Sequence, residues 1–159
     1  MKLDLKTRTA DHVRIYFSRT QDPEIREMLP SGVQTLEEAL ANFAQAQKPD
    51  AASYGRTIYV DGEYVGDIWC YCIDPSDEPQ AMVSYCIFEK SRWNQGIATA
   101  ALGEFLKEIV PKYSLQSIGA FTYSANLPSI QVLVRNDFTQ RQVFTEDGRE
   151  SRYFQLDIM

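Results

Sequence analysis

The chain has 159 residues, of which 44% are hydrophobic and 24% charged, which predicts one globular domain over residues 1–159 rather than a disordered chain. Its formal net charge is -6, so we expect no nucleic-acid partner, because phosphate contacts need a basic face. No apolar run approaches the roughly 20 residues that cross a bilayer, and none follows the charged start of the chain as in a signal peptide. We therefore expect no membrane contact and a cytoplasmic location.

The first half of the chain predicts a strand, two helices and a hairpin. Thr35 followed by Glu38 is a capping-box signature for a helix start, whereas Pro23 and Pro30-Ser31-Gly32 are expected to interrupt the chain. Asp61-Gly62 is a residue pair typical of a type I′ turn, which needs positive φ at both positions. The expected elements are a strand at residues 2–6, helices at residues 11–19 and from residue 36, a loop at residues 48–55, and strands at residues 56–60 and 63–73.

The second half predicts a buried strand followed by a long helix. The strand is apolar on both faces, with Val83, Tyr85 and Ile87 among its residues, so it is expected to be central in the sheet. Pro111 is expected to end the helix. The expected elements are strands at residues 80–88, 116–122, 138–144 and 151–158, helices at residues 96–110 and 127–136, and a turn at residues 146–148. This order predicts an α+β fold with a mixed, mostly antiparallel sheet and helices on both faces.

The most informative stretch is the polar loop that leads into the long helix. The first backbone N–H groups of a helix have no internal partner and lie at the positive end of its dipole, so they can bind an anion. Gly96 and Ala98 are small enough for a phosphate to approach the backbone, and Thr99 adds a hydroxyl. Lys90 and Arg92 supply positive charge nearby. Taken alone, the pattern also fits a glycine-started helix beside a solvated loop.

This stretch resembles motif A of the GNAT acetyltransferase superfamily, in which Arg or Gln is followed at fixed spacing by Gly and by Gly or Ala at a helix start. The sequence matches at Gly96 and Ala98. Trp93 replaces the usual Arg or Gln, as in the RimJ/RimL branch of ribosomal-protein acetyltransferases. Asn94 stands where that branch has Gly, and Ala100 where it has Glu. Asn adopts positive φ more readily than other non-glycine residues, so the backbone path can be kept.

A second segment resembles another motif of the same branch. It matches at Asn126, Ser129, Arg135 and Phe138, while Asp137 replaces a glycine. Together the two motifs imply the acyl-CoA N-acyltransferase (GNAT) fold, with three α/β/α layers. They also imply transfer of an acetyl group from acetyl-CoA to a primary amine by direct attack, without a metal.

The resemblance further implies roles for individual residues. In this family the strand before motif A separates from its parallel neighbour, and the pantetheine arm of the coenzyme fills the gap. The arm is thus expected to contact the backbone of Cys86, Ile87 and Phe88, with Asn126 on its other side. Ser129 is implied to hydrogen-bond the sulfur as charge develops, although a residue so placed can instead cap its own helix. The residues implied to hold the pyrophosphate are Arg92, Trp93, Asn94, Gln95, Gly96, Ile97, Ala98 and Thr99.

The sequence does not identify the base that takes the proton of the amine. Asp67, Glu89 and Glu146 are candidates by residue type only, and each is expected to be a solvated surface carboxylate. Tyr85 and Tyr123 lie on the two expected central strands and are expected to be core or wall residues.

The cysteines are expected to be reduced and to bind no metal. Cys70 and Cys72 lack the spacing of a zinc site, and no second ligand pair follows them. Cys86 could form a covalent acetyl intermediate only with a base or cation that lowers its pKa. The single histidine, His12, has no sequence reason to lie near it.

Two alternatives remain open beside an active enzyme. One is a non-catalytic coenzyme A-binding module of the same fold, and the other is an interaction module without a coenzyme. The acceptor is either a protein N-terminal amine or a small-molecule amine, in a groove expected at residues 14–33 and 144–151. A homodimer is also left open, since dimers are common in the family.

Overall fold

The computed structural model describes residues 1–29 and 35–158, and its strands form one seven-stranded mixed sheet. The strand order is β1-β2-β3-β4-β5-β7-β6, and neighbouring strands are antiparallel except for β4 and β5. The strands are β1 (Leu3–Thr7), β2 (Tyr54–Val60), β3 (Glu63–Asp74), β4 (Gln80–Ile87), β5 (Ser117–Tyr123), β6 (Thr139–Glu146) and β7 (Arg149–Asp157). β4 is the middle strand of the seven, as its apolar pattern predicted.

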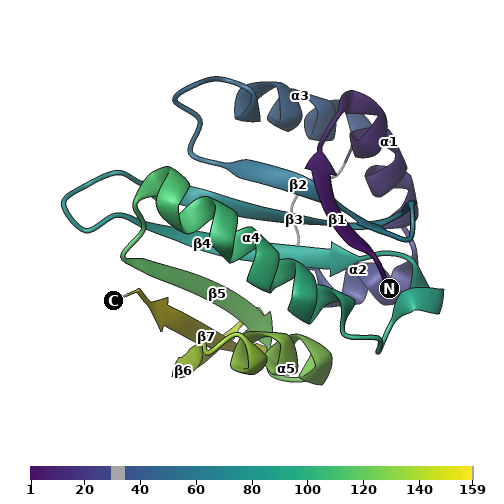
Figure 1. Ribbon diagram of the computed structural model, residues 1–159. Coiled ribbons are helices and arrows are strands. Elements are labelled where there is room, and N and C mark those ends of the chain that lie inside the picture. The colour runs from purple at the N-terminus through teal and green to yellow at the C-terminus, as the bar shows by residue number, and fades with distance from the viewer. Residues whose placement is uncertain (30–34, 159) are drawn as a thin grey trace.

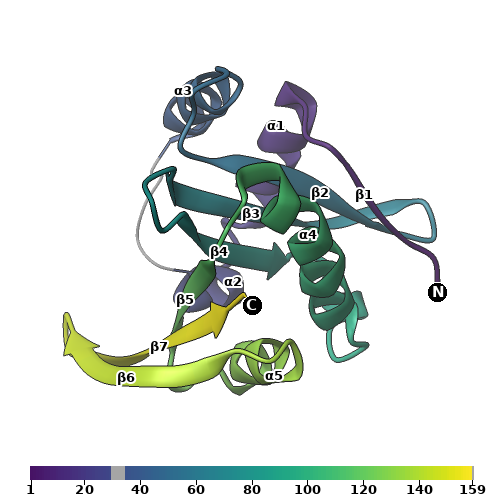
Figure 2. The same ribbon diagram turned by 60° about the vertical axis from the view of Figure 1, so that its left-hand side comes forward.

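Helices cover both faces of this sheet (Figures 1 and 2). α4 (Ile97–Tyr113) and α5 (Leu127–Arg135) pack on one face. α1 (Ala10–Arg19) and α2 (Pro23–Met28) pack on the other, and α3 (Leu36–Ala46) lies against α1. A short 3-10 helix, η1 (Lys90–Arg92), precedes α4. The three-layer arrangement confirms the predicted fold class.

The main core lies between α4 and the sheet. Leu102, Phe105 and Ile109 repeat at helical spacing along α4 and are fully buried. They belong to the same cluster as Ile58 of β2 and Ile68 of β3, which are also fully buried. Burying a side chain of this size stabilises the fold by about 1.5–3 kcal/mol. This face therefore holds α4, and with it the start of α4, in a fixed place over β4.

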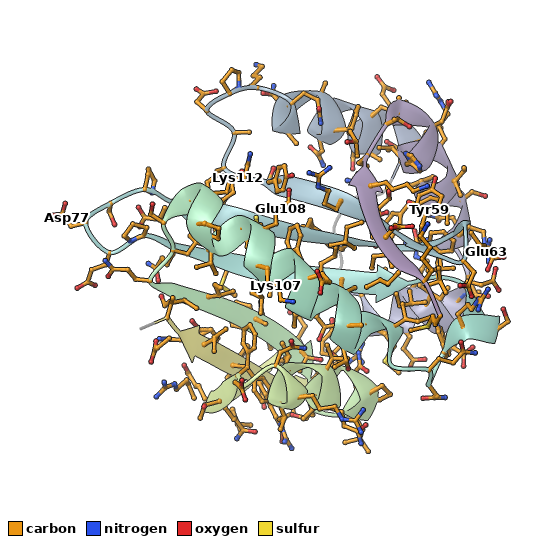
Figure 3. The ribbon with its side chains drawn as sticks, viewed as in Figure 1. Tyr59, Glu63, Asp77, Lys107, Glu108 and Lys112 are labelled. Atoms are coloured by element: carbon orange, nitrogen blue, oxygen red, sulfur yellow. The ribbon has the colours of Figure 1, made fainter. Side chains whose placement is uncertain are left out.

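A polar contact at the edge of the core fixes the other end of α4. Glu108 projects from α4 toward β2 (Figure 3), where its carboxylate accepts a hydrogen bond from Arg56 at 2.7 Å and another from the Tyr54 hydroxyl. The β3–β4 turn with Asp77 lies at this end of the sheet, away from the start of α4 (Figures 1 and 3).

The turn predicted from the pair Asp61-Gly62 and the turn predicted at residues 146–148 are both present. Asp61 and Gly62 have φ of 52° and 84°, and Asp147 and Gly148 have φ of 51° and 76°. Positive φ at both positions is what a two-residue type I′ connection needs. The turns set the registers of β2 with β3 and of β6 with β7.

Two predictions about helices were wrong. Pro23 does not interrupt the chain but begins α2, because Asp22 caps that helix by accepting from the Glu24 amide at 2.9 Å. Pro111 does not end α4, which continues to Tyr113. A proline in the last turn removes only one helical hydrogen bond, so the helix can extend slightly beyond it.

Part of one expectation cannot be compared with the structure. The predicted interruption at Pro30-Ser31-Gly32 lies outside the described residues. Within the described residues, no helix combines the length and the apolar character that crossing a bilayer requires.

Candidate functional site

The sheet opens between its two parallel strands. β4 and β5 pair only at their beginnings, where Gln80, Ala81 and Met82 lie opposite Ser117 to Gly119. Beyond Met82 the strands diverge toward their carboxyl ends (Figure 1). β5 stays paired with β7, so the divergence leaves one edge of β4 without a strand partner. This is the separation that the sequence resemblance predicted.

A cleft of about 470 Å³ lies where the strands part. Its walls come from the end of β4, the loop and start of α4, one side of α5, and α2. The cleft brings together most of the residues that the sequence implied. These are Cys86, Ile87, Arg92, Trp93, Asn94, Gly96, Ile97, Ala98, Thr99, Asn126 and Ser129.

Two of the expected residues do not line the cleft. Phe88 is 1% exposed, and its amide donates to the Val65 carbonyl at 2.9 Å, so this amide is already used inside the sheet. Gln95 turns back on its own loop, where its side-chain amide donates to the Ser91 carbonyl at 3.1 Å. The sequence motif placed both residues in the correct segment, but it could not show that the Phe88 amide and the Gln95 side chain point away from the cleft.

The start of α4 is the one helix start in the described residues that has no side-chain cap. Gly96, its N-cap residue, has φ of 77°, and its carbonyl accepts the first helical bond from Ala100 at 3.0 Å. The amides of Ile97, Ala98 and Thr99 therefore have no partner inside the helix. All three residues line the cleft, so the positive end of the helix dipole faces it.

The loop before α4 follows the path that the sequence predicted. Asn94 has φ of 62°, which shows that asparagine supplies the positive φ expected of a glycine. Asp137 at the end of α5 does the same, with φ of 69°. The two non-glycine replacements in the motifs therefore keep the turns that glycine usually makes.

Trp93 ties this loop to the end of the central strand. Its indole N–H donates to the Ile87 carbonyl at 2.7 Å, and its ring packs with Cys86, Phe88 and Ile25. Trp93 thus positions the loop before α4 against the end of β4.

Close approach of two strands also fixes the end of β4. A Cβ added to Gly66 of β3 would lie 2.3 Å from the Cys86 carbonyl oxygen, so only glycine fits there. Since Phe88 donates to β3 and backbone amides alternate in direction along a strand, the Ile87 amide points away from β3, into the opening.

Two arginines bring positive charge to the cleft. Arg92 lies 3.3 Å from Glu63 and 3.8 Å from Asp61, so acidic residues partly offset its charge. Arg135 is exposed and makes no ion pair in the described part of the chain. The two side chains come from different elements, the loop before α4 and the end of α5.

Lys90 serves another purpose than the predicted anion contact. Its ammonium group lies 2.8 Å from Asp22 and 2.8 Å from Glu24, which joins η1 to α2. Arg19 joins η1 to α1 by a 2.8 Å contact with Glu89. The Arg19 hydrogen bond lowers the pKa of Glu89, so this carboxylate is a poor candidate for a base.

Ser129 and Asn126 divide two tasks at the start of α5. Asn126 caps the helix, because its side-chain oxygen accepts from the Ser129 amide at 3.3 Å. The Ser129 hydroxyl instead lies 3.0 Å from the Tyr85 hydroxyl, which also donates to the Ser129 carbonyl at 3.2 Å. Burial raises the pKa of Tyr85 to about 12, so the phenol stays neutral. Tyr85 was expected to be a core or wall residue, and it packs against the core and lines the cleft.

Cys86 is not activated as a nucleophile. Burial raises the pKa of its thiol to about 12, and the partner of the thiol is the Tyr16 hydroxyl. His12 is engaged elsewhere, with one ring nitrogen 2.7 Å from the Tyr59 hydroxyl and the other 2.8 Å from the Thr9 hydroxyl. No group of metal-binding side chains occurs among the described residues.

Asp67 was expected at the surface, but it is 1% exposed. It lies on the α1 side of the sheet, 3.1 Å from the Arg8 guanidinium, and accepts a hydrogen bond from the Tyr64 hydroxyl. Burial raises its pKa to about 6, although Arg8 and Tyr64 act in the opposite direction. Glu146 and Tyr123, the other residues weighed from the sequence, lie outside the cleft.

A second hollow, of about 510 Å³, lies beside the loop that joins α3 to β2. None of the residues implied by the motifs lines it. The cleft at the divergence of β4 and β5 is therefore the site that the sequence and the geometry share.

Comparisons with known proteins bear on the family and the fold of the chain. The model of the acetyltransferase (GNAT) domain matches residues 2–139. A solved structure of RimJ from Mycobacterium smegmatis with a CoA disulfide superposes with a TM-score of 0.82 at 20% identity, covering 98% of this chain and 81% of that chain. No curated protein sequence matched the chain.

Two other solved structures have the same fold. RimL, a ribosomal-protein alpha-N-acetyltransferase in complex with coenzyme A, gives a TM-score of 0.82 at 19% identity, covering 99% of this chain and 95% of that chain. Aminoglycoside acetyltransferase AAC(6')-Ib in complex with coenzyme A gives a TM-score of 0.80 at 14% identity, covering 98% of this chain and 95% of that chain.

Proposed function

Because the chain belongs to the acetyltransferase (GNAT) family, we propose that the cleft between β4 and β5 is where it binds acetyl-CoA and acetylates a primary amine. The protein is an acetyl-CoA-dependent N-acetyltransferase. The observation that carries the assignment of the site is the uncapped start of α4, which faces the cleft beside the unpaired edge of β4.

The residues of the cleft fit the parts of the coenzyme. The free amides of Ile97, Ala98 and Thr99 suit a diphosphate, which is a double anion held best by several N–H donors. Arg92 and Arg135 add positive charge for the phosphates at the rim. The free edge of β4 suits the amide groups of the pantetheine arm, which can pair with it as a neighbouring strand would.

The reacting thioester then belongs at the end of β4. We place its carbonyl oxygen at the Ile87 amide, which can stabilise the negative charge that develops on that oxygen. The amine nitrogen forms a bond to the carbonyl carbon, and the carbon–sulfur bond breaks with its electron pair leaving on sulfur. Ser129 donates a hydrogen bond to that sulfur. A thiol of pKa about 8.5 is a tolerable leaving group near neutral pH, so no proton needs to be transferred from Ser129.

The proton of the attacking amine needs a separate acceptor. Among the described residues that line the cleft, Glu24 is the carboxylate, and it is paired with Lys90 at 2.8 Å. We therefore propose that water takes this proton, either as a single molecule beside the amine or as a chain of water molecules that leads out of the cleft.

The acceptor is expected to enter on the side of α2. Met28 and Leu29 line the cleft there, and Arg149 of the β6–β7 hairpin donates to the Glu27 carbonyl at 2.9 Å. That contact joins the two segments that the sequence suggested as an acceptor groove. A net charge of -6 favours a cationic amine. RimL acts on a ribosomal-protein amine and AAC(6')-Ib on aminoglycosides, so a peptide N-terminus and a small polyamine are the two acceptor classes to test.

Three further features remain proposals. We propose a cytoplasmic protein in which residues 1–159 form one catalytic domain. We also propose that it forms a homodimer, which sedimentation at micromolar concentration would detect as twice the mass of one chain.

A panel of acceptors tests the proposed activity. Polyamines, amino acids, aminoglycosides and short peptides with free N-termini are each supplied with acetyl-CoA, and released coenzyme A thiol is followed. We expect at least one acceptor to raise thiol release above the acceptor-free rate, and Gly96→Glu to remove that increase.

The same panel tests the second candidate, a coenzyme A-binding module without catalysis. The absence of an unpaired carboxylate or histidine among the described cleft residues is the observation that favours it. Tight binding of acetyl-CoA with no thiol release for any acceptor class would establish that function and contradict ours.

A further inference from the structure

Tyr85 and Ser129 form a hydroxyl pair that bridges the two sides of the opening. Tyr85 projects from β4 and Ser129 from the start of α5, and both line the cleft. Their hydroxyl oxygens are 3.0 Å apart, and the Tyr85 hydroxyl is also 3.2 Å from the Ser129 carbonyl oxygen. One phenol thus contacts two acceptors on the same residue.

Hydrogen-bond accounting allows two arrangements of this pair. The Tyr85 hydroxyl has one proton, and so does the Ser129 hydroxyl. If Tyr85 donates to the carbonyl, the Ser129 proton can point to the phenol oxygen and away from the cleft. If Tyr85 donates instead to the Ser129 hydroxyl oxygen, the phenol oxygen does not accept from Ser129 across the same contact. The Ser129 proton is then free to point into the cleft.

We propose that Tyr85 is a positioning residue that turns the Ser129 hydroxyl proton toward the leaving sulfur. The inference rests on the proposed function, because Ser129 acts there on the sulfur. In the resting protein the phenol is shared between the carbonyl and the hydroxyl of Ser129. As the carbon–sulfur bond breaks and the electron pair moves to sulfur, Tyr85 donates to the Ser129 oxygen, and Ser129 donates to sulfur.

Neither hydroxyl gives up its proton in this step, and the proton of the attacking amine goes to water as proposed above. The acetyl carbon gains its bond to nitrogen and loses its bond to sulfur. Coenzyme A leaves as a thiolate that accepts a hydrogen bond from Ser129. Donation by Tyr85 polarises the Ser129 hydroxyl and strengthens the bond to sulfur, because hydrogen bonds in a chain reinforce one another.

The surroundings of Tyr85 favour this role over proton donation. Its ring packs against the main core, which fixes the place of the hydroxyl. The carbonyl of Ser129 is part of the α5 backbone, where an oxygen can accept the helical bond and one more. Moving the phenol proton from that carbonyl to the hydroxyl oxygen therefore leaves no buried carbonyl without a partner.

A double-mutant cycle in the full chain tests the inference. Tyr85→Phe, Ser129→Ala and the double variant are compared in kcat and in KM for acetyl-CoA with the best acceptor of the panel. We expect Tyr85→Phe to lower kcat about tenfold, with KM for acetyl-CoA nearly unchanged, because the lost interaction strengthens only as the sulfur leaves. We expect the double variant to be no slower than Ser129→Ala, since Tyr85 acts through Ser129.

Tyr71→Phe is the matched control, because Tyr71 lies on β3 beside the second hollow and outside the cleft. It should leave kcat within twofold of the wild type. Thermal unfolding of each variant checks the fold, and Tyr85→Phe keeps the ring in the core. A merely structural role for Tyr85 would lower the unfolding temperature and add its effect to that of Ser129→Ala.

The outcomes separate the inference from the proposed function. A large loss in Ser129→Ala with no loss in Tyr85→Phe would overturn the inference and leave the function in place. Independent, multiplicative losses in the double variant would also overturn it. Unchanged kcat in both single variants, with the activity present, would overturn the role of Ser129 and the inference together.

Discussion

Two neighbouring regions, the α1 face of β3 and the cleft beside β4, use polar groups in opposite ways. On the α1 side, Asp67 is buried against Arg8 at 3.1 Å and accepts from Tyr64. On the cleft side, the amides of Ile97, Ala98 and Thr99 at the start of α4 are donors that have no partner among the described residues. Buried polar groups that partner one another hold a fold together, whereas free donors lining a cleft are available for a ligand.

Helix starts in the molecule show the same contrast. At the start of α3, the Thr35 hydroxyl accepts from the Glu38 amide at 3.1 Å. At the start of α5, Asn126 does the equivalent for Ser129. α4 alone among the described helices lacks such a cap, and it alone begins with a glycine at φ of 77°. The difference teaches that an unsatisfied helix start beside an opening indicates binding rather than instability.

The largest effect is expected from a negative charge at the open helix start. Gly96→Glu places a carboxylate where the coenzyme diphosphate is proposed to lie, and we expect acetyl-CoA affinity to fall by about 1,000-fold or more, which corresponds to about 4 kcal/mol. Isothermal titration with acetyl-CoA measures this loss.

Gly96→Ala separates charge from backbone strain in the same experiment. A Cβ at Gly96 would meet nothing within 4 Å, so the alanine costs only the strain of positive φ, about 1–2 kcal/mol of folding free energy. Its acetyl-CoA affinity should stay close to that of the wild type. Equal affinity of Gly96→Glu and Gly96→Ala for the coenzyme would break the comparison.

The next effect is expected at the buried Asp67 cluster on the α1 face of β3. Asp67→Ala leaves the Arg8 guanidinium and the Tyr64 hydroxyl without their shared partner, and we expect it to lower the free energy of unfolding by about 3 kcal/mol. Urea unfolding measures this change. The affinity for acetyl-CoA at a temperature where the variant is folded should be unchanged. A selective loss of coenzyme binding with normal stability would show that the cluster belongs to the site.

The smallest effect is expected at a capped helix start. Thr35→Ala removes the acceptor for the Glu38 amide and should lower stability by about 1 kcal/mol without changing coenzyme affinity. Thr35→Ser, which keeps a hydroxyl, is the matched control and should lie near the wild type in the same urea titration. A drop in coenzyme affinity in Thr35→Ala would contradict the division between capped and open starts.

Much of the fold could be predicted because local signals were strong. Asp61-Gly62 identified the hairpin, and the apolar run around Val83 identified the central strand. Short elements were harder: α2 was missed because Pro23 suggested an interruption, although Asp22 followed by proline is itself a helix-start signal. The position of Pro111 could not tell whether α4 ends before or after its last turn.

The cleft was predictable where one motif carried its residues. The resemblance to the two motifs implied the loop from Trp93 to the first turn of α4 and the pair Asn126 and Ser129, and these residues line the cleft. The partnership of Tyr85 with Ser129 joins residues 44 positions apart, so no local pattern could reveal it. The burial of Asp67 likewise depends on how α1 packs over β3, which a strand pattern does not specify.

A crystal structure of the protein with coenzyme A tests the central claim most directly. We predict diphosphate oxygens about 3 Å from the amides of Ile97, Ala98 and Thr99, a distance typical of N–H···O hydrogen bonds, and a pantetheine arm along the free edge of β4. Diphosphate density in the second hollow or elsewhere, with only water at the start of α4, would contradict it.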